Sequence, residues 1–371
     1  MPGAFLMPQG DDHNATPADS LHWMRAFLME DFPQLLRRLI QGGTMTAEES
    51  ASALGAIFDE ELSTGQAAAL LTALAARGET TEEVIGAATA MRQRALRVDH
   101  QLPLVIDIVG TGGDGTRSIN ISTAAALVVA GAGVAVAKHG NRAASSACGS
   151  ADVLEALGVP LDRDPVATAE LLASDRIAFL FAPRYHPAMK AVAGLRRELG
   201  VRTIFNLLGP LCNPAGTQRL LVGVFGEPQV ELVAEAMQGL GIEAGAVVHS
   251  ASGMDEVSGE GPTWVAQFGP EGSSRWLLNP EEHGVRASLE DLRGGDARTN
   301  AELIIAILRD ERSPQADVVA LNASLALVLA AAAADIDEGM AMARASVSSG
   351  AALAALDALR RGASQLQSAN G

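Results

Sequence analysis

The sequence predicts an α/β protein in which a small helical unit precedes a larger part built on a mostly parallel sheet. Between Pro33 and about Arg97, helix-start signals recur and no strand pattern interrupts them. From Leu102 onward, short apolar strands alternate with helical segments, and such alternation implies parallel pairing. The chain has 371 residues, of which 48% are apolar, so it is long enough for roughly two domains.

The N-terminal part divides into an extension and a group of helices. Residues 1–34 show no sustained hydrophobic period, and we expect an extension there that is partly disordered. Thr46 and Thr80 each precede an acidic first turn, and Thr64 opens an Ala- and Leu-rich run. These signals predict three or four short helices.

The alternation after Leu102 gives the order of the remaining elements. Strands are expected at residues 104–109, 134–137, 177–181, 220–224 and 244–249. Helices are expected between them at residues 120–131, 150–157, 187–199 and 229–239. Short β-like pieces such as 263–268 follow, and 299–359 is predicted to be Ala- and Leu-rich helix. Because parallel strands bury both sides, helices should cover both faces of the sheet.

Composition argues against several classes of function. The 27 Lys and Arg against 44 Asp and Glu give a net charge of −17, which repels nucleic-acid phosphates. Two cysteines, Cys148 and Cys212, provide neither a disulfide framework nor a zinc-binding pair. The longest apolar run, 121–137, is shorter than a bilayer span of about 20 residues. Residues 1–20 lack the Lys or Arg of a signal peptide, so we expect a cytoplasmic protein without nucleic-acid or membrane partners.

Residues 110–115 read Gly-Thr-Gly-Gly-Asp-Gly between a predicted strand and a predicted helix. The backbone amides of such a loop, with a helix dipole behind them, favour a phosphate site. The spacing also fits the Gly-x-Gly-x-x-Gly pattern of dinucleotide-binding folds. Asp114 beside a pyrophosphate, and Lys138 where a ribose-binding acid is expected, count against that alternative. A tight turn without any ligand is the remaining alternative.

Polar side chains gather near this loop and at the end of the next strand. Asn120 and Ser122 begin the following helix, where they could cap it or bind phosphate or metal. The second strand leads into two cations, an imidazole and an amide, from Lys138, His139, Asn141 and Arg142. The carboxyl end of a parallel strand is where open sheets bind ligands. The loop beyond adds hydroxyl groups from Ser145, Ser146 and Ser150.

Two further segments carry charge that a substrate could use. Asp255 and Glu256 follow a predicted strand, and consecutive carboxylates suit Mg²⁺, which prefers oxygen ligands and substrate phosphates. A solvated acidic turn is the alternative, but the cationic loops favour a phosphorylated substrate that arrives with a metal. Arg196 and Arg202, near a helix end, are either partners of the helix dipole or ligands for a substrate carboxylate.

Together these motifs resemble the anthranilate phosphoribosyltransferase family, which shares its fold with the pyrimidine nucleoside phosphorylases. The motifs are Gly-Thr-Gly-Gly-Asp at 110–114, Asn-Ile-Ser-Thr at 120–123, Lys-His-Gly-Asn at 138–141, Asn-Leu-Leu-Gly-Pro at 206–210 with Asn213-Pro214, and Met-Asp-Glu at 254–256. The resemblance covers roughly residues 35–365. It implies a small all-helical domain, 35–101 plus about 188–212, hinged to an α/β domain, 102–187 plus 213–371, with the site between them.

The resemblance also implies roles for single residues. Substrate contacts are implied for Gly110, Thr111, Gly113, Asp114, Ser118, Asn120, Ile121, Ser122, Thr123, Lys138, His139, Gly140, Asn141, Arg142, Ser145, Ser146, Ser150 and Arg196. Asn141 and Arg196 would meet anthranilate, while the glycine loop, its helix and Lys138 would hold 5-phosphoribosyl 1-pyrophosphate. Mg²⁺ would be held by Ser122, Asp255 and Glu256. The implied catalytic residues are His139, Lys138 and Arg196, with His139 beside the amine.

The implied reaction joins the phosphoribosyl group to the amine of anthranilate and releases pyrophosphate, in tryptophan biosynthesis. A homodimer through the helical domain is implied as well. Ala147 and Cys148 stand where the family often has a Lys after the Ser pair, which puts one phosphate contact in doubt. Two rivals stay open at this point: a dinucleotide-dependent oxidoreductase, and a non-catalytic relative that keeps the fold as a binding module.

Overall fold

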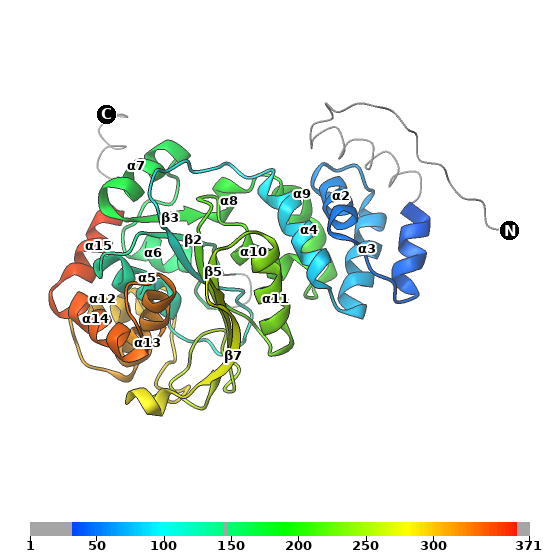
Figure 1. Ribbon diagram of the computed structural model, residues 1–371. Helices are drawn as coiled ribbons and strands as arrows, with labels where there is room; N and C mark the ends of the chain where they lie inside the picture. Colours follow the sequence, from blue (N-terminus) through cyan, green and yellow to red (C-terminus); the bar gives the residue numbers. More distant parts are fainter. Residues whose placement is uncertain (1–31, 144–146, 362–371) are drawn as a thin grey trace, which may run out of the picture.

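A sheet of seven strands lies at the centre of the larger part of the molecule (Figure 1). The computed structural model describes residues 32–143 and 147–361. The strand order is β3-β2-β1-β4-β5-β6-β7, in which β3 to β5 are parallel and β6 and β7 are antiparallel. The strands are β1 (Ile106–Gly110), β2 (Val136–Gly140), β3 (Ile177–Phe181), β4 (Arg219–Gly223), β5 (Ala244–Ser250), β6 (Thr263–Gly269) and β7 (Gly272–Leu278). The predicted mostly parallel sheet is confirmed.

Helices cover both faces of this sheet, as the apolar character of its parallel strands requires. One face packs against α5 (Ile121–Gly131), which is surrounded by the C-terminal helices. These are α12 (Ala297–Leu308), α13 (Pro314–Leu329), α14 (Ile336–Ser348) and α15 (Ala351–Arg360). The opposite face packs against α11 (Pro228–Gly239). Shorter connections are α6 (Ser150–Ala156), α7 (Pro165–Asp175), α8 (Ala182–Tyr185) and the 3₁₀ turn Pro280–His283.

The helical unit lies beside one end of the sheet and is built from two separate parts of the chain (Figure 1). Its first part contains residues 32–40 and then α2 (Ala47–Phe58), α3 (Thr64–Arg77) and α4 (Thr81–Arg92). The last three begin with capping boxes, in which a hydroxyl accepts from the amide three residues later, at Thr46, Ser63 and Thr80. Its second part, α9 (Met189–Leu199) and α10 (Phe205–Leu211), packs against these helices. The unit shares one apolar core with α11 and the adjacent sheet face.

Strand β2 differs from its prediction in a way that matters for the site. It spans Val136–Gly140 and not 134–137, because it pairs with β3 in the register Lys138↔Phe179 and His139↔Leu180. Lys138 and His139 therefore lie inside the strand, and successive strand residues point to opposite faces.

Three other segments of the chain differ from their predictions. Residues 206–210, for which no helix was predicted, form most of α10, although Pro210 lies inside that helix. The helix α7 was not predicted, although Asp164 caps it and a proline follows in the first turn. Residues 32–34 are helical, and Phe32 is buried in the helical core, so the expected extension was placed too far along the chain. Residues 1–31 lie outside the described part.

Within the described residues, no helix is long and apolar enough to cross a membrane.

Glycine at position 86 permits the close packing of α2 on α4. A Cβ at Gly86 would lie 2.1 Å from the Ala47 carbonyl oxygen and 2.6 Å from the Ser50 Cβ. We expect Gly86→Ala to destabilise the protein by about 1–3 kcal/mol, because the two helices must separate. Gly194, in α9, has nothing within 4 Å of such a Cβ, so Gly194→Ala should stabilise by up to about 1 kcal/mol. Urea unfolding gives the unfolding free energy of both variants. Equal changes in the two variants would contradict the packing argument.

Candidate active site

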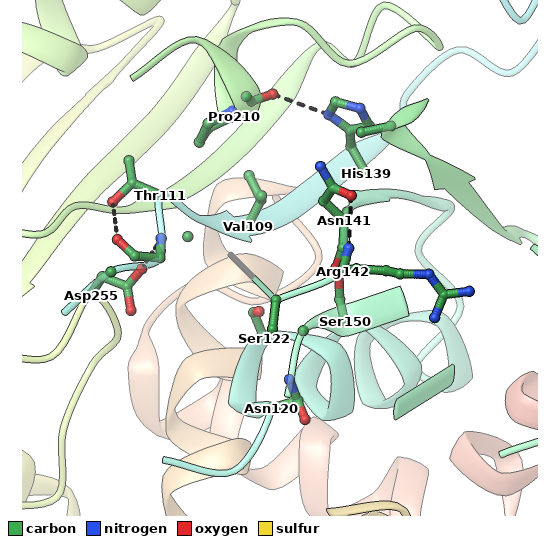
Figure 2. A pocket seen from close by; sticks show the side chains of 18 of the residues that line it. Val109, Thr111, Asn120, Ser122, His139, Asn141, Arg142, Ser150, Pro210 and Asp255 are labelled. Atoms are coloured by element: carbon green, nitrogen blue, oxygen red, sulfur yellow. Dashed lines mark hydrogen bonds between the residues drawn. The ribbon is translucent and has the colours of Figure 1, made fainter. Parts of the chain in front are cut away.

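A cavity of about 510 Å³ lies at the carboxyl ends of the parallel strands, between the sheet and the helical unit (Figure 2). Most residues predicted for the site line it: Gly110, Thr111, Gly113, Asp114, Ser118, Asn120, Ser122, Thr123, Lys138, His139, Gly140, Asn141, Arg142, Ser150, Arg196, Asp255 and Glu256. Ile121 does not, because its side chain is buried in the core under α5 and its N–H donates to the Ile119 carbonyl. Ser145 and Ser146 lie outside the described residues.

The glycine loop, residues 110–115, leaves β1 and is held in place by the end of β4 and by Asp255, which follows β5. The Thr111 N–H donates to the Gly223 carbonyl at 2.9 Å, and the Gly112 N–H donates to Asp255 Oδ2 at 2.6 Å. Gly112 has φ of +69°, which glycine adopts without strain. A Cβ at Gly110 would lie only 2.5 Å from Asp255 Oδ2. Glycine at this strand end is therefore what lets the Asp255 carboxylate approach the loop.

Asp255 and Glu256, the acidic pair, lie against the loop and the start of α5, where Asp255 is buried and Glu256 is half-buried. Asp255 is 7% exposed, and Glu256 Oε1 accepts from the Ser122 N–H at 3.2 Å. Burial raises the pKa of both carboxyl groups, and the neighbouring Asp114 raises the pKa of Asp255 further. Two desolvated carboxylates side by side are costly when both are ionised, so this end of the cavity favours a cation.

The residues at this end fit a magnesium ion that is bound together with a phosphorylated substrate. Two carboxylates and the Ser122 hydroxyl supply oxygen ligands only, which is the donor set that Mg²⁺ prefers. In residues 32–143 and 147–361, no group of three or more His, Cys, Asp or Glu forms a complete metal site. Mg²⁺ usually keeps waters and takes substrate phosphate oxygens as further ligands, so an incomplete protein site is consistent with it.

Lys138 places a cation on the same side of β2 as the acidic pair. Its Nζ donates to the Ile108 carbonyl at 2.7 Å and lies 3.4 Å from the Ser122 Oγ. Burial lowers the pKa of this amine, and the surrounding carboxylates, including Asp107 and Glu256, oppose that shift. The Lys138 ammonium group can therefore bind an anion that occupies the cavity beside Ser122.

His139, the next residue of β2, points to the opposite side and faces the helical unit (Figure 2). Its Nδ1 lies 3.0 Å from the Gly209 carbonyl oxygen, and because a carbonyl only accepts, Nδ1 carries the hydrogen. Its Nε2 is then an acceptor, and it is buried without a hydrogen-bond partner among the described residues. Burial lowers the pKa of His139 to about 3, and the nearby His186 ring adds to that effect. His139 is therefore a neutral imidazole that presents a lone pair.

Two predicted contacts are already used within the protein. Asn120 donates to the Cys148 carbonyl at 3.1 Å and accepts from Asn300 at 2.9 Å, so its amide braces the loop before α6. Arg142 forms ion pairs with Asp152 at 2.9 Å and Glu155 at 2.8 Å. Its guanidinium extends away from Asp255 in Figure 2. The substrate contact implied for Arg142 stays a prediction, and the acidic residues of α6 balance its charge.

The side of the cavity formed by the helical unit was largely missed from the sequence. Arg196 lines it and lies over the Phe205 ring, with 5.8 Å from its Cζ to the ring centroid. Further lining residues there are Met91, His186, Met189, Lys190, Phe205, Gly209 and Pro210. His186 follows the end of β3 by a few residues, and that position at the edge of a parallel sheet was the available signal. Arg202, the other predicted carboxylate ligand, is not among the lining residues.

The buried imidazoles should make stability depend on pH. Burial lowers the pKa of His139 to about 3 and that of His186 to about 4, against about 6.5 in an unfolded chain. Between about pH 6.5 and pH 4 the unfolded state binds more protons, so these groups should reduce stability as the pH falls. Asp107, Asp255 and Glu256, whose pKa values burial raises to about 6, about 7 and about 8, act in the opposite sense, because their carboxyl groups bind protons in the folded state before they do in the unfolded state.

We expect His186→Asn to remove one of the two groups that destabilise the fold as the pH falls. Between about pH 7.5 and about pH 5, the unfolding free energy of the variant should change by about 2 kcal/mol more in the stabilising direction than that of the original protein. Urea titrations at the two pH values measure it, and an unchanged difference would mean that His186 is not held neutral by burial.

Comparisons with known proteins agree along nearly the whole chain. Residues 102–353 match the glycosyl transferase family, a/b domain, and residues 33–95 match the helical bundle domain of the same family. Anthranilate phosphoribosyltransferase from Rhodopseudomonas palustris (strain BisA53) is 46% identical over 88% of this chain and 97% of its own. The Thermus thermophilus enzyme structure is 45% identical, with a TM-score of 0.83 over 88% of this chain and 99% of its own. A Saccharomyces cerevisiae enzyme in complex with PRPP and Mg is 28% identical, with a TM-score of 0.81 over 95% of this chain and 100% of its own. The chain belongs to the anthranilate phosphoribosyltransferase family.

Proposed function

We propose that this protein transfers the phosphoribosyl group of 5-phosphoribosyl 1-pyrophosphate to the amine of anthranilate and releases pyrophosphate, a step of tryptophan biosynthesis. The observation that carries the proposal is the meeting of the glycine loop and the acidic pair in one cavity, where Gly112 donates to Asp255 at 2.6 Å. The yeast relative solved with PRPP and Mg supports the same donor and metal here. The family to which the chain belongs supports the same acceptor.

The sheet side of the cavity is suited to the donor. Loop amides not used by Asp255 and Gly223 can bind pyrophosphate oxygens, with the positive end of α5 behind them. Lys138 supplies the nearest buried cation. Ser122, Asp255 and Glu256 would hold Mg²⁺, which when bound would neutralise charge on the departing pyrophosphate.

The side formed by the helical unit is suited to the acceptor. Arg196 offers a guanidinium for the anthranilate carboxylate, and Phe205 and Pro210 provide apolar surface for the ring. The His139 Nε2 lone pair can accept a hydrogen bond from the amine and so direct the amine nitrogen toward the donor. Lys138 and His139, successive residues of β2, thus face the donor and the acceptor from opposite sides.

In the proposed reaction a bond forms between the amine nitrogen and C1 of the ribose, and the bond from C1 to the pyrophosphate oxygen breaks. The arylamine is neutral before attack, so no strong base is needed to generate the nucleophile. The nitrogen becomes positive on bond formation and loses its proton afterwards. A histidine with a pKa of about 3 is a weak base, so His139 orients the amine and water is the final proton acceptor. Charge stabilisation and positioning carry most of the rate enhancement.

Several finer expectations belong to the same proposal. We propose a helical domain of residues 35–101 plus about 188–212 that is hinged to the remainder and closes to exclude water from the donor. We also propose Mg²⁺ dependence, a homodimer through the helical domain, and a cytoplasmic location.

Fluorescence of anthranilate, followed with 5-phosphoribosyl 1-pyrophosphate and Mg²⁺, tests the proposal directly. We expect the anthranilate fluorescence to fall as one pyrophosphate is released per anthranilate consumed. EDTA should stop the reaction. Titration with NAD(H) and NADP(H) tests the oxidoreductase alternative, which the position of Lys138 in β2 disfavours. Tight dinucleotide binding without anthranilate consumption would overturn the proposal. If the protein neither bound a dinucleotide nor consumed anthranilate, a binding module would be favoured.

The acidic pair should be indispensable for turnover. We expect Asp255→Asn with Glu256→Gln to reduce kcat/KM at least a thousandfold, because the cation that balances pyrophosphate is lost. The matched control is Glu281→Gln with Glu282→Gln, an exposed acidic pair that does not line the cavity. Normal turnover of the first double variant with Mg²⁺ would refute the metal assignment.

His139 should contribute far less than the acidic pair. We expect His139→Ala to lower kcat about tenfold or less, since the imidazole orients the amine and removes no proton before attack. Steady-state kinetics should show a higher KM for anthranilate and a nearly unchanged KM for the donor. A loss beyond a thousandfold would instead identify His139 as an essential base.

A further inference from the structure

Arg202 connects the helical unit to the glycine loop without entering the cavity. It lies between α9 and α10, and its guanidinium donates to the Gly113 carbonyl oxygen. The same guanidinium stacks on Phe225, with 4.4 Å from Cζ to the ring centroid. Phe225 follows β4, so three segments from different parts of the chain meet at one side chain. The mechanism proposed above gives Arg202 no role.

The contact with Gly113 fixes the direction of a neighbouring amide. In a trans peptide unit the carbonyl and the following N–H point in opposite directions, and no cis peptide bond occurs in the described residues. The carbonyl of Gly113 is held on the Arg202 side, so the N–H of Asp114 must point away from Arg202. Gly113 and Asp114 both line the cavity, whereas Arg202 does not.

Three glycines make the loop adjustable. The Asp114 side chain, which accepts from the Thr116 N–H at 3.2 Å and from its hydroxyl at 2.6 Å, braces only the far end of the loop. Gly112, Gly113 and Gly115 all have positive φ values, of 69°, 77° and 80°, and glycine is free to leave such conformations. On one side the loop is tied by Gly112 to Asp255 and by Thr111 to Gly223. Arg202 ties the other side, and a cation bound to a carbonyl also strengthens the N–H of the same peptide unit as a donor.

We propose that Arg202 is a positioning residue for the phosphoribosyl donor, acting through the Gly113 carbonyl to aim the Asp114 N–H at the pyrophosphate. This inference rests on the proposed function, because pyrophosphate is the anion concerned. It also gives the helical unit a physical connection to the donor loop, since Arg202 and the acceptor-side residues Arg196 and Phe205 come from the same segment.

The stack on Phe225 distinguishes positioning from direct contact with phosphate. A planar guanidinium can donate to a carbonyl while it lies flat on a ring, and an ammonium lacks that geometry. If Arg202 acts through Gly113, loss of the ring should reproduce part of the loss of the arginine. If Arg202 met the pyrophosphate itself, its charge alone would matter and the ring would not.

The experiment compares Arg202→Ala, Arg202→Lys and Phe225→Leu, with Arg197→Ala as the matched control. Arg197 is an exposed arginine in the last turn of α9 and does not line the cavity, so its loss changes the net charge equally. Calorimetry measures binding of pyrophosphate with Mg²⁺, and kinetics give kcat and both KM values. We expect Arg202→Ala to weaken pyrophosphate binding and raise the donor KM about tenfold, with the anthranilate KM and melting temperature nearly unchanged.

The other variants complete the test. Phe225→Leu should weaken pyrophosphate binding about threefold, its effect should not add to that of Arg202→Ala, and Arg202→Lys should restore little. Full rescue by lysine with no effect of Phe225→Leu would indicate direct contact and overturn the inference. The inference would also be overturned if Arg202→Ala bound pyrophosphate as well as Arg197→Ala does. A lower melting temperature of Arg202→Ala, together with an equal loss of affinity for both substrates, would overturn it as well. A wild-type protein that binds no pyrophosphate and consumes no anthranilate would overturn the proposed function, and this inference with it.

Discussion

The close approach of Asp255 to the ends of two strands is the constraint on which the whole site depends. A Cβ at Gly110 would lie 2.5 Å from the Asp255 carboxylate, and one at Gly223 would lie 1.4 Å from its carbonyl oxygen. Only glycine at the ends of β1 and β4 leaves room for the segment that carries the acidic pair. The pair can then lie beside a loop of backbone amides. The negative charge of the pair favours a cation there, and the loop amides favour an anion. A magnesium-bound diphosphate satisfies both.

The alternation of side chains along β2 separates the two halves of the proposed chemistry. Lys138 points toward Ser122 and the acidic pair, and His139 points toward Gly209 of the helical unit. One strand thereby places a buried cation and a neutral imidazole on opposite sides of the reaction centre without any loop between them. Because the strand is held by neighbours on both edges, their spacing is set by backbone geometry.

The helical unit contributes more than a cover for the cavity. It brings apolar surface, Arg196 and the Gly209 carbonyl that fixes the tautomer of His139. It shares a core with one sheet face, so movements of the unit are coupled to the strands that carry the site. The contact of Arg202 with Gly113 extends this coupling to the donor loop.

The sequence by itself determined the α/β class, the helical unit and most of the donor side. Those features are local: strand and helix periods, glycines in a turn, and polar residues that directly follow a strand. It did not determine that Lys138 and His139 lie within β2 on opposite faces, since the register with β3 decides this. Nor did it determine that Arg142 is neutralised by α6, that Asn120 braces a loop, or that His186 lines the cavity. These depend on which distant side chains become neighbours, and burial sets their charge states only when the chain has folded.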